Sequence, residues 1–169
     1  MTISMHSASV PVFNRQFGAM LAWLDKAEAH AAARSFDANN YLQLRLAPDM
    51  LPFVSQIRIA SDSAKACVAR LAGQEAPKFV DNEVSLADLR ERIRKTVEYV
   101  NSVPAAAING SEAREIVIPM RTRDPLVFAG EPYLKHWALP NFFFHVGMAY
   151  ALLRHAGVDL GKQDFLATP

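Results

Sequence analysis

Apolar residues recur at alternating steps of three and four along four long stretches of this chain, and this periodicity constrains the fold more than any other feature. Such spacing lines one face of an α-helix, because a helical turn holds about 3.6 residues. The stretches are about Ser4 to Arg34, Met50 to Leu71, Leu86 to Val103 and Leu134 to His155. The sequence therefore predicts an all-α fold in which four antiparallel amphipathic helices pack as a bundle, with axes about 20° apart.

Residues at the ends of these stretches have the chemistry of helix ends. Pro48 and Asp49 fit the first turn of the second helix, since proline lacks an N–H and an acidic side chain favours the positive end of the helix dipole. Gly73 fits its carboxyl end, where a left-handed conformation is common. Ser85 is placed to cap the third helix, with Asp88 three residues later as an acidic relative of a capping box.

The period changes between Ala105 and Pro132, before the last long helix. Segments Arg114 to Pro119 and Pro125 to Gly130 are rich in apolar and β-branched residues and flank turn residues at Arg121 to Asp124. They predict a small β-hairpin or an extended insert. The prolines permit only edge strands, because proline cannot donate to a strand ladder.

The last long helix is apolar on two faces. Beside the row that contains Asn141 and His145, a second row is fully apolar. It consists of Phe142, Val146, Ala149 and Leu153. A helix that is apolar on two faces must be buried on both. Either this helix lies centrally in the fold, or its second row packs on another subunit, so a homodimer is one expectation.

Length and charge bound the class of protein. The chain has 169 residues, near the size of one domain, and we expect residues 1–169 to form a single domain. Lys and Arg number 18 and Asp and Glu 17, a formal balance of +1, without a basic cluster. Nucleic-acid binding is disfavoured, because it demands clustered cations on the surface.

Cysteine use and hydropathy indicate the compartment. Cys67 is the only cysteine, so no intramolecular disulfide can form, and we expect an inert buried thiol on the second helix. The first residues lack the basic start and apolar core of a signal peptide. No uninterrupted apolar stretch reaches the ~18 residues that span a bilayer. These features predict a cytoplasmic protein without a membrane partner.

Polar side chains on the apolar rows need a reason, because a core position favours an apolar residue. Asn141 and His145 are four residues apart, about 40° around a helix, and so face the same way. His6 lies on the inward row of the first helix, and Gln56 flanks the row of the second. We predict a polar small-molecule pocket formed by Gln56, Asn141, His145 and His6. The alternative is that Asn141 and His145 satisfy each other as hydrogen-bonded core residues, with His6 in solvent.

Two parts of the sequence resemble a known family. One is Tyr133-Leu134-Lys135-His136-Trp137-Ala138-Leu139-Pro140-Asn141-Phe142-Phe143-Phe144-His145-Val146, and the other is Arg45-Leu46-Ala47-Pro48-Asp49-Met50 with Ala69-Arg70-Leu71-Ala72-Gly73. Over nearly the whole chain, the sequence is similar to an uncharacterised bacterial family of the DinB/YfiT-like superfamily. The resemblance implies an up-down-down-up four-helix bundle that is commonly dimeric. Better-known members of the superfamily bind a divalent metal, usually zinc or nickel, through three histidines, and some are thiol S-transferases.

When the three metal-binding histidines of the superfamily are matched to this sequence residue by residue, only one of them is present as a histidine. His145 matches the second histidine of a pair on the last helix, whereas Asn141 stands in place of the first. The histidine of the second helix has no equivalent; Gln56 is nearest, and Asp62 lies further round, on a face expected to be solvated. A zinc-activated water or thiol needs about three strong protein ligands. The resemblance therefore implies a degenerate metal site in which His145 is the remaining metal ligand.

Three functions are compatible with these patterns. The first is a small-molecule pocket with no firmly held metal. The second is a divalent-metal-dependent enzyme of the thiol S-transferase or hydrolase type, in which zinc or nickel binds His145 and a second ligand comes from His6, Gln56 or Asp62. The third is a structural module that dimerises through the second row of the last helix. The sequence contains no nucleophile elbow and no Gly-rich phosphate loop, so it indicates no further enzyme class.

Overall fold

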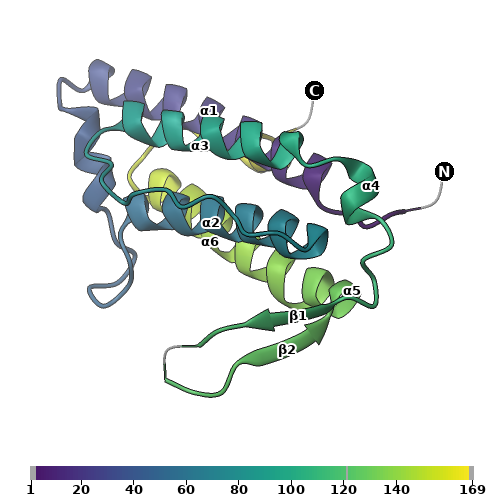
Figure 1. Cartoon of the computed structure of the whole chain (residues 1–169). Helices are drawn as coiled ribbons and strands as arrows, with labels where there is room; N and C mark the ends of the chain where they lie inside the picture. The colour runs from purple at the N-terminus through teal and green to yellow at the C-terminus, as the bar shows by residue number, and fades with distance from the viewer. Residues whose placement is uncertain (1–2, 121, 168–169) are drawn as a thin grey trace.

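The fold is taken from a computed structural model and is described for residues 3–120 and 122–167. Its long helices are α1 (Val10–Ala33), α2 (Phe53–Ala72), α3 (Leu86–Ser102) and α6 (Leu139–His155). Shorter helical elements are η1 (Ala38–Gln43), α4 (Ala105–Ile108), α5 (Gly130–Tyr133), the π-helical turn η2 (Leu134–Ala138) and α7 (Lys162–Leu166). Two short strands, β1 (Glu115–Ile118) and β2 (Leu126–Ala129), form a small sheet (Figure 1). No helix in the described ranges is long and apolar enough to cross a membrane.

The long helices surround a hydrophobic core. α2 packs along both α6 and α3, and α1 in turn packs on α3 and α6 (Figure 1). In the core, the ring of Phe142 lies edge-on to Phe13 at 4.8 Å and to Phe17 at 5.4 Å between ring centroids. All three rings are fully buried, so aromatic packing ties α1 to α6.

Two helices begin later than the periodicity predicts. α1 begins at Val10 and not at Ser4, and turns precede it. Pro11 explains the difference, because proline fits the first turn of a helix but not its interior. α2 begins at Phe53, with Pro52 as its N-cap, and not near Met50. In both cases a proline, and not the apolar row, sets the start.

The predicted end of α2 and start of α3 are confirmed. Gly73 closes α2 with φ of 70°, in the left-handed region that favours glycine. The hydroxyl of Ser85 accepts a hydrogen bond from the N–H of Asp88 at 3.1 Å. The carboxylate of Asp88 in turn accepts from the N–H of Val84 at 3.0 Å. This is the reciprocal bonding of a capping box, displaced by one residue at its outer end.

An extended segment, residues 74–85, runs back along α2 before α3 begins (Figure 1). We call it the crossing segment. Its 12 residues reach about 40 Å when extended. The 20-residue α2 is about 30 Å long, so the segment is long enough to return the chain along the whole helix.

The predicted hairpin before the last helix is confirmed. β1 pairs antiparallel with β2, with Glu115 opposite Ala129 and Ile118 opposite Leu126. Alternate residues of β1 are buried, and the sheet packs beside α5. Arg121, in the expected turn, lies outside the described residues.

α5, η2 and α6 form one continuous helix from Gly130 to His155. In its π turn, the N–H of Leu139 donates to the carbonyl of Leu134, five residues earlier. Pro140 follows directly. A proline inside a helix clashes with the carbonyl four residues before it, and the wider π turn relieves this clash without ending the helix.

The second apolar row of α6 is covered within the chain itself. Phe142, Val146, Ala149 and Leu153 are each at most 1% exposed. Of the two alternatives for this helix, the central position therefore holds, and another subunit is not what covers the row. The neighbouring row, with Asn141 and His145, is half-buried and faces α2.

Candidate functional site

Polar contacts follow the line along which α2 packs on the last long helix. Side-chain hydrogen bonds join Gln56 to His145 at 2.8 Å, Ser63 to Asn141 at 2.9 Å and Arg70 to Tyr133 at 3.1 Å. The three α2 residues are seven apart, about two helical turns, so they share one face. Their partners come in reverse order along the chain, which means that the two helices pack antiparallel. We call this row of contacts the polar seam.

A chain of hydrogen bonds orients the imidazole of His145. Nε2 of Gln56 donates to the carbonyl oxygen of Leu51 at 2.8 Å, so Oε1 of Gln56 faces Nδ1 of His145, 2.8 Å away. Gln56 is only 2% exposed, so its amide has no solvent alternative. Because a carbonyl oxygen only accepts, Nδ1 carries the proton. The neutral ring then has its lone pair on Nε2.

Nε2 of His145 is the reactive atom of the polar seam. It has no hydrogen-bond partner among the described residues, and it is not shut off from solvent. Burial of the ring lowers the pKa of His145 below its ordinary value of about 6.5, so the ring is neutral at pH 7. An unprotonated nitrogen of this kind can accept a hydrogen bond, take up a proton or bind a metal.

Asn141 supplies a second acceptor, one turn before His145. Its Nδ2 donates to Oγ of Ser63 at 2.9 Å, which leaves Oδ1 free to accept. Side chains four apart lie on the same face of a helix. The structure thus brings Gln56, Asn141 and His145 onto one seam between α2 and α6.

His6 and Asp62 lie apart from the polar seam. In the turn before α1, the backbone N–H of His6 donates to Oδ1 of Asn109 at 3.0 Å. No hydrogen bond or ion pair within the described part of the chain joins His6 to the seam. Asp62, expected on a solvated face, is half-exposed but forms ion pairs with Lys65 at 2.9 Å and Arg92 at 3.0 Å. It therefore serves as a structural counter-charge.

The donor atoms of the polar seam do not fit a three-histidine metal centre. The seam holds a single imidazole, its side-chain oxygen atoms belong to amides and hydroxyls, and amide oxygens are poor ligands for zinc or nickel. In residues 3–120 and 122–167, no group of three or more His, Cys, Asp or Glu side chains is placed to hold a metal ion. Cys67 is fully buried, and burial raises the pKa of its thiol, as expected for an inert cysteine.

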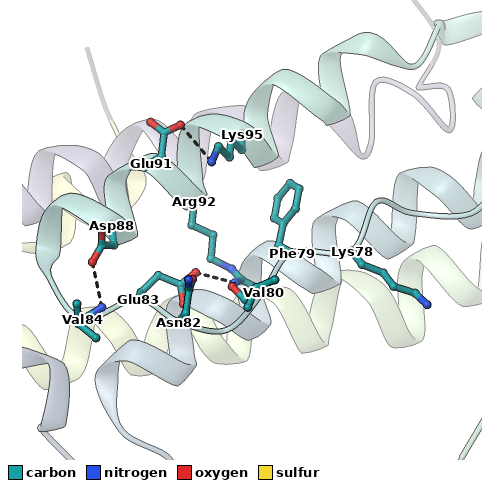
Figure 2. Close-up of a pocket in the computed structure, with 10 residues that line it drawn as sticks. All are labelled: Lys78, Phe79, Val80, Asn82, Glu83, Val84, Asp88, Glu91, Arg92 and Lys95. Atoms are coloured by element: carbon teal, nitrogen blue, oxygen red, sulfur yellow. Dashed lines mark hydrogen bonds and ion pairs between the residues drawn. The ribbon is translucent and has the colours of Figure 1, made fainter.

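Cavities of about 610, 360 and 290 Å³ lie elsewhere, except that the second of them is lined by Arg70 at one end of the polar seam. None of these three is lined by Gln56, Asn141 or His145. The largest of them lies between the crossing segment and α3 (Figure 2). Sequence reasoning missed this place.

Arg92 is the central charge of that cavity wall. Its side chain is 2% exposed and forms ion pairs with Glu83 at 2.7 Å, Asp81 at 2.9 Å and Asp62 at 3.0 Å. A signal for it was present in the sequence, because Arg92 is three residues after Leu89 and therefore lies on the apolar row of α3. The criterion that selected His145, a polar residue on an apolar row, also selects Arg92.

Burial and charge oppose each other in this cluster. Burial alone raises the pKa of Glu83, but hydrogen bonds from Arg92 and Arg58 outweigh it and hold the pKa of that carboxyl below its usual range. Burial likewise lowers the pKa of Arg92, and the surrounding carboxylates raise it further than burial lowers it. Lys65 completes the cluster, with Nζ 3.6 Å from the ring centroid of Phe79. The cluster therefore pins the crossing segment to α2 and α3.

Comparison with known proteins agrees with this architecture. The chain is similar to a DinB family member protein from Shewanella denitrificans, whose crystal structure was determined at 1.83 Å resolution. The two are 36% identical with a TM-score of 0.87, and the match covers 97% of this chain and 92% of the other. The fold and the sequence identity thus define a DinB-like helical protein.

A family model refines this assignment. It matches residues 5–166 and is described as a domain of unknown function, DUF1993. The chain belongs to this DinB-like family, as the resemblance of its last long helix predicts. None of the curated proteins matches the chain.

Proposed function

We propose that this chain binds a small molecule at the polar seam, in a degenerate form of a DinB-type metal site. The observation that supports this most is the open Nε2 of His145, with the ring held in one tautomer by Gln56 and the carbonyl of Leu51. A buried amide that orients an imidazole in this way prepares the second ring nitrogen for a partner. One imidazole without two further strong ligands favours an organic ligand over a tightly held metal.

The ligand expected at the polar seam is a hydrogen-bond donor. Nε2 of His145 and Oδ1 of Asn141 both accept, so an ammonium or hydroxyl group satisfies both atoms, whereas a carboxylate satisfies neither. The ring of Phe144 is 55% exposed, and its centroid lies 5.2 Å from that of His145. An exposed aromatic ring favours a cation. A small organic ammonium compound therefore fits the seam best.

Titration with n-butylammonium at pH 7.5, followed by backbone amide chemical shifts, tests the proposal. We expect shifts at residues of the polar seam, and binding about fivefold weaker in His145→Ala and in Asn141→Ala. Butanoate, which only accepts, is expected not to bind there. His155→Ala is the matched control, since His155 is an exposed histidine at the end of the same helix. Unchanged affinity in both seam variants removes the proposal.

A metal-dependent enzyme is the alternative, and one contact favours it. Metal-binding histidines commonly donate their second ring N–H to an acceptor, as His145 does to Gln56. Elemental analysis of protein purified without affinity-tag histidines separates the two proposals. One zinc or nickel ion per chain, lost in His145→Ala, supports the enzyme. Substoichiometric metal that does not rise on addition of zinc or nickel excludes it.

The proposal also includes an up-down-down-up order of the long helices and a symmetric dimer. The order is supported by the crossing segment, which runs back along α2 (Figure 1). Because the second row of α6 is internal, the dimer must use other apolar side chains, such as the exposed Phe143. Sedimentation is expected to show a dimer that Phe143→Ser weakens. A monomeric wild type at micromolar concentration excludes the dimer.

A further inference from the structure

The cavity of about 610 Å³ beneath the crossing segment has the size of a small-molecule site, for which volumes of about 300–1,000 Å³ are typical. Figure 2 shows Arg92 descending from α3 towards the crossing segment, which carries Phe79, and the guanidinium carbon of Arg92 lies 5.8 Å from the ring centroid of Phe79. The crossing segment and α3, which follow each other directly along the chain, thus build one wall each. The chemistry of the cavity follows from which of its polar groups already have partners.

Two of the three carboxylates that line the cavity already accept short hydrogen bonds. Glu83 accepts from two arginines, at 2.5 and 2.7 Å. Asp88 caps α3 and accepts from a backbone N–H at 3.0 Å and from a hydroxyl at 2.8 Å. Glu91 makes a longer contact, 3.5 Å to Lys95. Glu83 and Asp88 therefore have little acceptor capacity left for a cationic ligand, whereas Glu91 and Lys95 share only this long contact.

Two cationic side chains of the cavity have donor capacity left. Nε of Arg92 is buried and has no hydrogen-bond partner among the described residues, although Arg92 lines the cavity and its side chain is 2% exposed. A buried donor without a partner is unfavourable, and an acceptor that enters the cavity satisfies it. Lys95 has only the long contact to Glu91, so its ammonium is available to an anion. Lys78 extends away from Arg92 and Lys95 in Figure 2, so we do not include it among the groups that bind the anion.

Apolar side chains complete the cavity. The ring of Phe79 has the ammonium of Lys65 over one face, 3.6 Å from its centroid. Val80 and Val84 line the cavity and are 75% and 77% exposed. Such uncovered apolar surface is stabilised when a ligand buries it.

From this pairing we infer that the cavity binds a small monocarboxylate with an apolar body. The carboxylate accepts hydrogen bonds from Nε of Arg92 and from the ammonium of Lys95, and the apolar body covers Val80 and Val84 beside Phe79. Phenylacetate is a small probe with this chemistry. Phenylacetamide keeps an acceptor but loses the charge, and phenethylamine reverses the charge, so the three compounds form a matched series.

Titration of the full-length ¹⁵N-labelled chain with each compound, followed by amide chemical shifts, tests the inference. Phenylacetate is expected to produce saturable shifts concentrated in residues 78–95 and to bind about tenfold more tightly than the other two. Lys95→Gln and Val80→Ser are each expected to weaken its binding about fivefold. Both side chains are exposed, so both variants retain the fold. Arg94→Gln is the matched control, because Arg94 is an exposed neighbouring cation outside the cavity lining.

Several outcomes overturn the inference. They are equal binding of the three compounds, unchanged affinity in Lys95→Gln, absence of saturable shifts at millimolar phenylacetate, and tighter binding of inorganic phosphate than of phenylacetate. His145→Ala is expected to leave phenylacetate binding unchanged. The proposed carboxylate site and the proposed ligand site at the polar seam can therefore be tested independently of each other.

Discussion

Nδ1 of His145 and Oε1 of Gln56 are 2.8 Å apart, and this contact joins α6 to the first turn of α2. The carbonyl of Leu51 holds the other end of the glutamine amide, so Gln56 acts toward the ring as an acceptor only. A fully buried amide thereby sets the tautomer of a half-buried histidine. The lone pair of Nε2 consequently lies on the side of the ring away from Gln56, where a ligand can reach it.

The lowered pKa of His145 makes stability depend on pH. The unfolded chain takes up this proton near pH 6.5, whereas the folded chain resists it because the ring is buried. Stability is therefore complete above about pH 6.5, falls as the pH drops towards the folded pKa, and levels off below it. The expected loss is up to about 1.4 kcal/mol for each unit by which folding lowers the pKa.

Urea unfolding of the wild type and His145→Gln at pH 7.5 and pH 5.5 measures this effect. The carboxylates make the same contribution to the pH dependence of stability in both proteins. The difference between the two proteins in stability lost on acidification therefore reports on His145. We expect the wild type to lose more stability than the variant between the two pH values. An equal loss, or an NMR titration that places the pKa of His145 above 6.5, contradicts the prediction.

Gln56→Leu is expected to destabilise the fold and release the tautomer of His145. The leucine fills similar space but leaves the Nδ1–H of His145 without an acceptor, which costs about 1–3 kcal/mol. Ring ¹⁵N shifts are expected to show Nε2 unprotonated in the wild type and a mixture of tautomers in Gln56→Leu. Gln56→Glu is the control, because it keeps the acceptor and its charge raises the pKa of His145. A single unchanged tautomer in Gln56→Leu means that the glutamine does not set it.

The long helices and part of the polar seam could be predicted because both depend on spacing within one helix. The four-residue step alone places Asn141 and His145 on one face. Their partners depend on how α2 docks, so neither Ser63 nor the carbonyl of Leu51 follows from the sequence pattern. The apolar rows predict starts for α1 and α2 that are too early. The reason is local, because a proline determines where each helix begins even when the apolar row extends further.

The charged cluster around Arg92 could not be predicted from periodicity. Glu83 and Asp81 belong to the crossing segment, whose pattern marks only a connection between helices. They reach Arg92 because that segment runs back along α2, which is a property of the tertiary fold (Figure 1). What the sequence does carry is the position of Arg92 on an apolar row.

Arg92→Met is expected to destabilise the fold strongly. The change leaves Glu83, whose side chain is 6% exposed, with Arg58 as its remaining partner, and it removes one ion-pair partner each from Asp81 and Asp62. Removing one partner of a buried ion pair costs about 3–5 kcal/mol. Lys95→Met is the control, because its 3.5 Å contact joins exposed side chains and contributes at most about 1 kcal/mol. Urea unfolding at pH 7 compares them, and equal losses contradict the buried role of Arg92.

Replacement of glycine by alanine is expected to lower the stability of the fold at Gly130 and to raise it at Gly18. A Cβ at Gly130 would lie 2.0 Å from the backbone oxygen of Ser111, which also accepts from the N–H of Arg114 at 3.0 Å. The backbone there is held by its own hydrogen bond and cannot move aside cheaply, so Gly130→Ala is expected to cost about 3 kcal/mol. Gly18, exposed in the middle of α1, has nothing within 4 Å of the new Cβ. Gly18→Ala is therefore expected to stabilise the fold by about 0.5–1 kcal/mol, because alanine loses less backbone entropy than glycine in a helix.

Thermal unfolding separates these two effects. For a chain of this length, 1 kcal/mol corresponds to a shift in Tm of about 2–4 °C. Gly130→Ala is expected to lower Tm by several degrees, and Gly18→Ala to raise it by about 1–4 °C. Gly147→Ala is a second reference, since its Cβ also meets nothing within 4 Å and Gly147 lies within α6. A Tm for Gly130→Ala equal to that of Gly147→Ala shows that the start of α5 can move away from Ser111, and with it the hairpin that leads into the last helix.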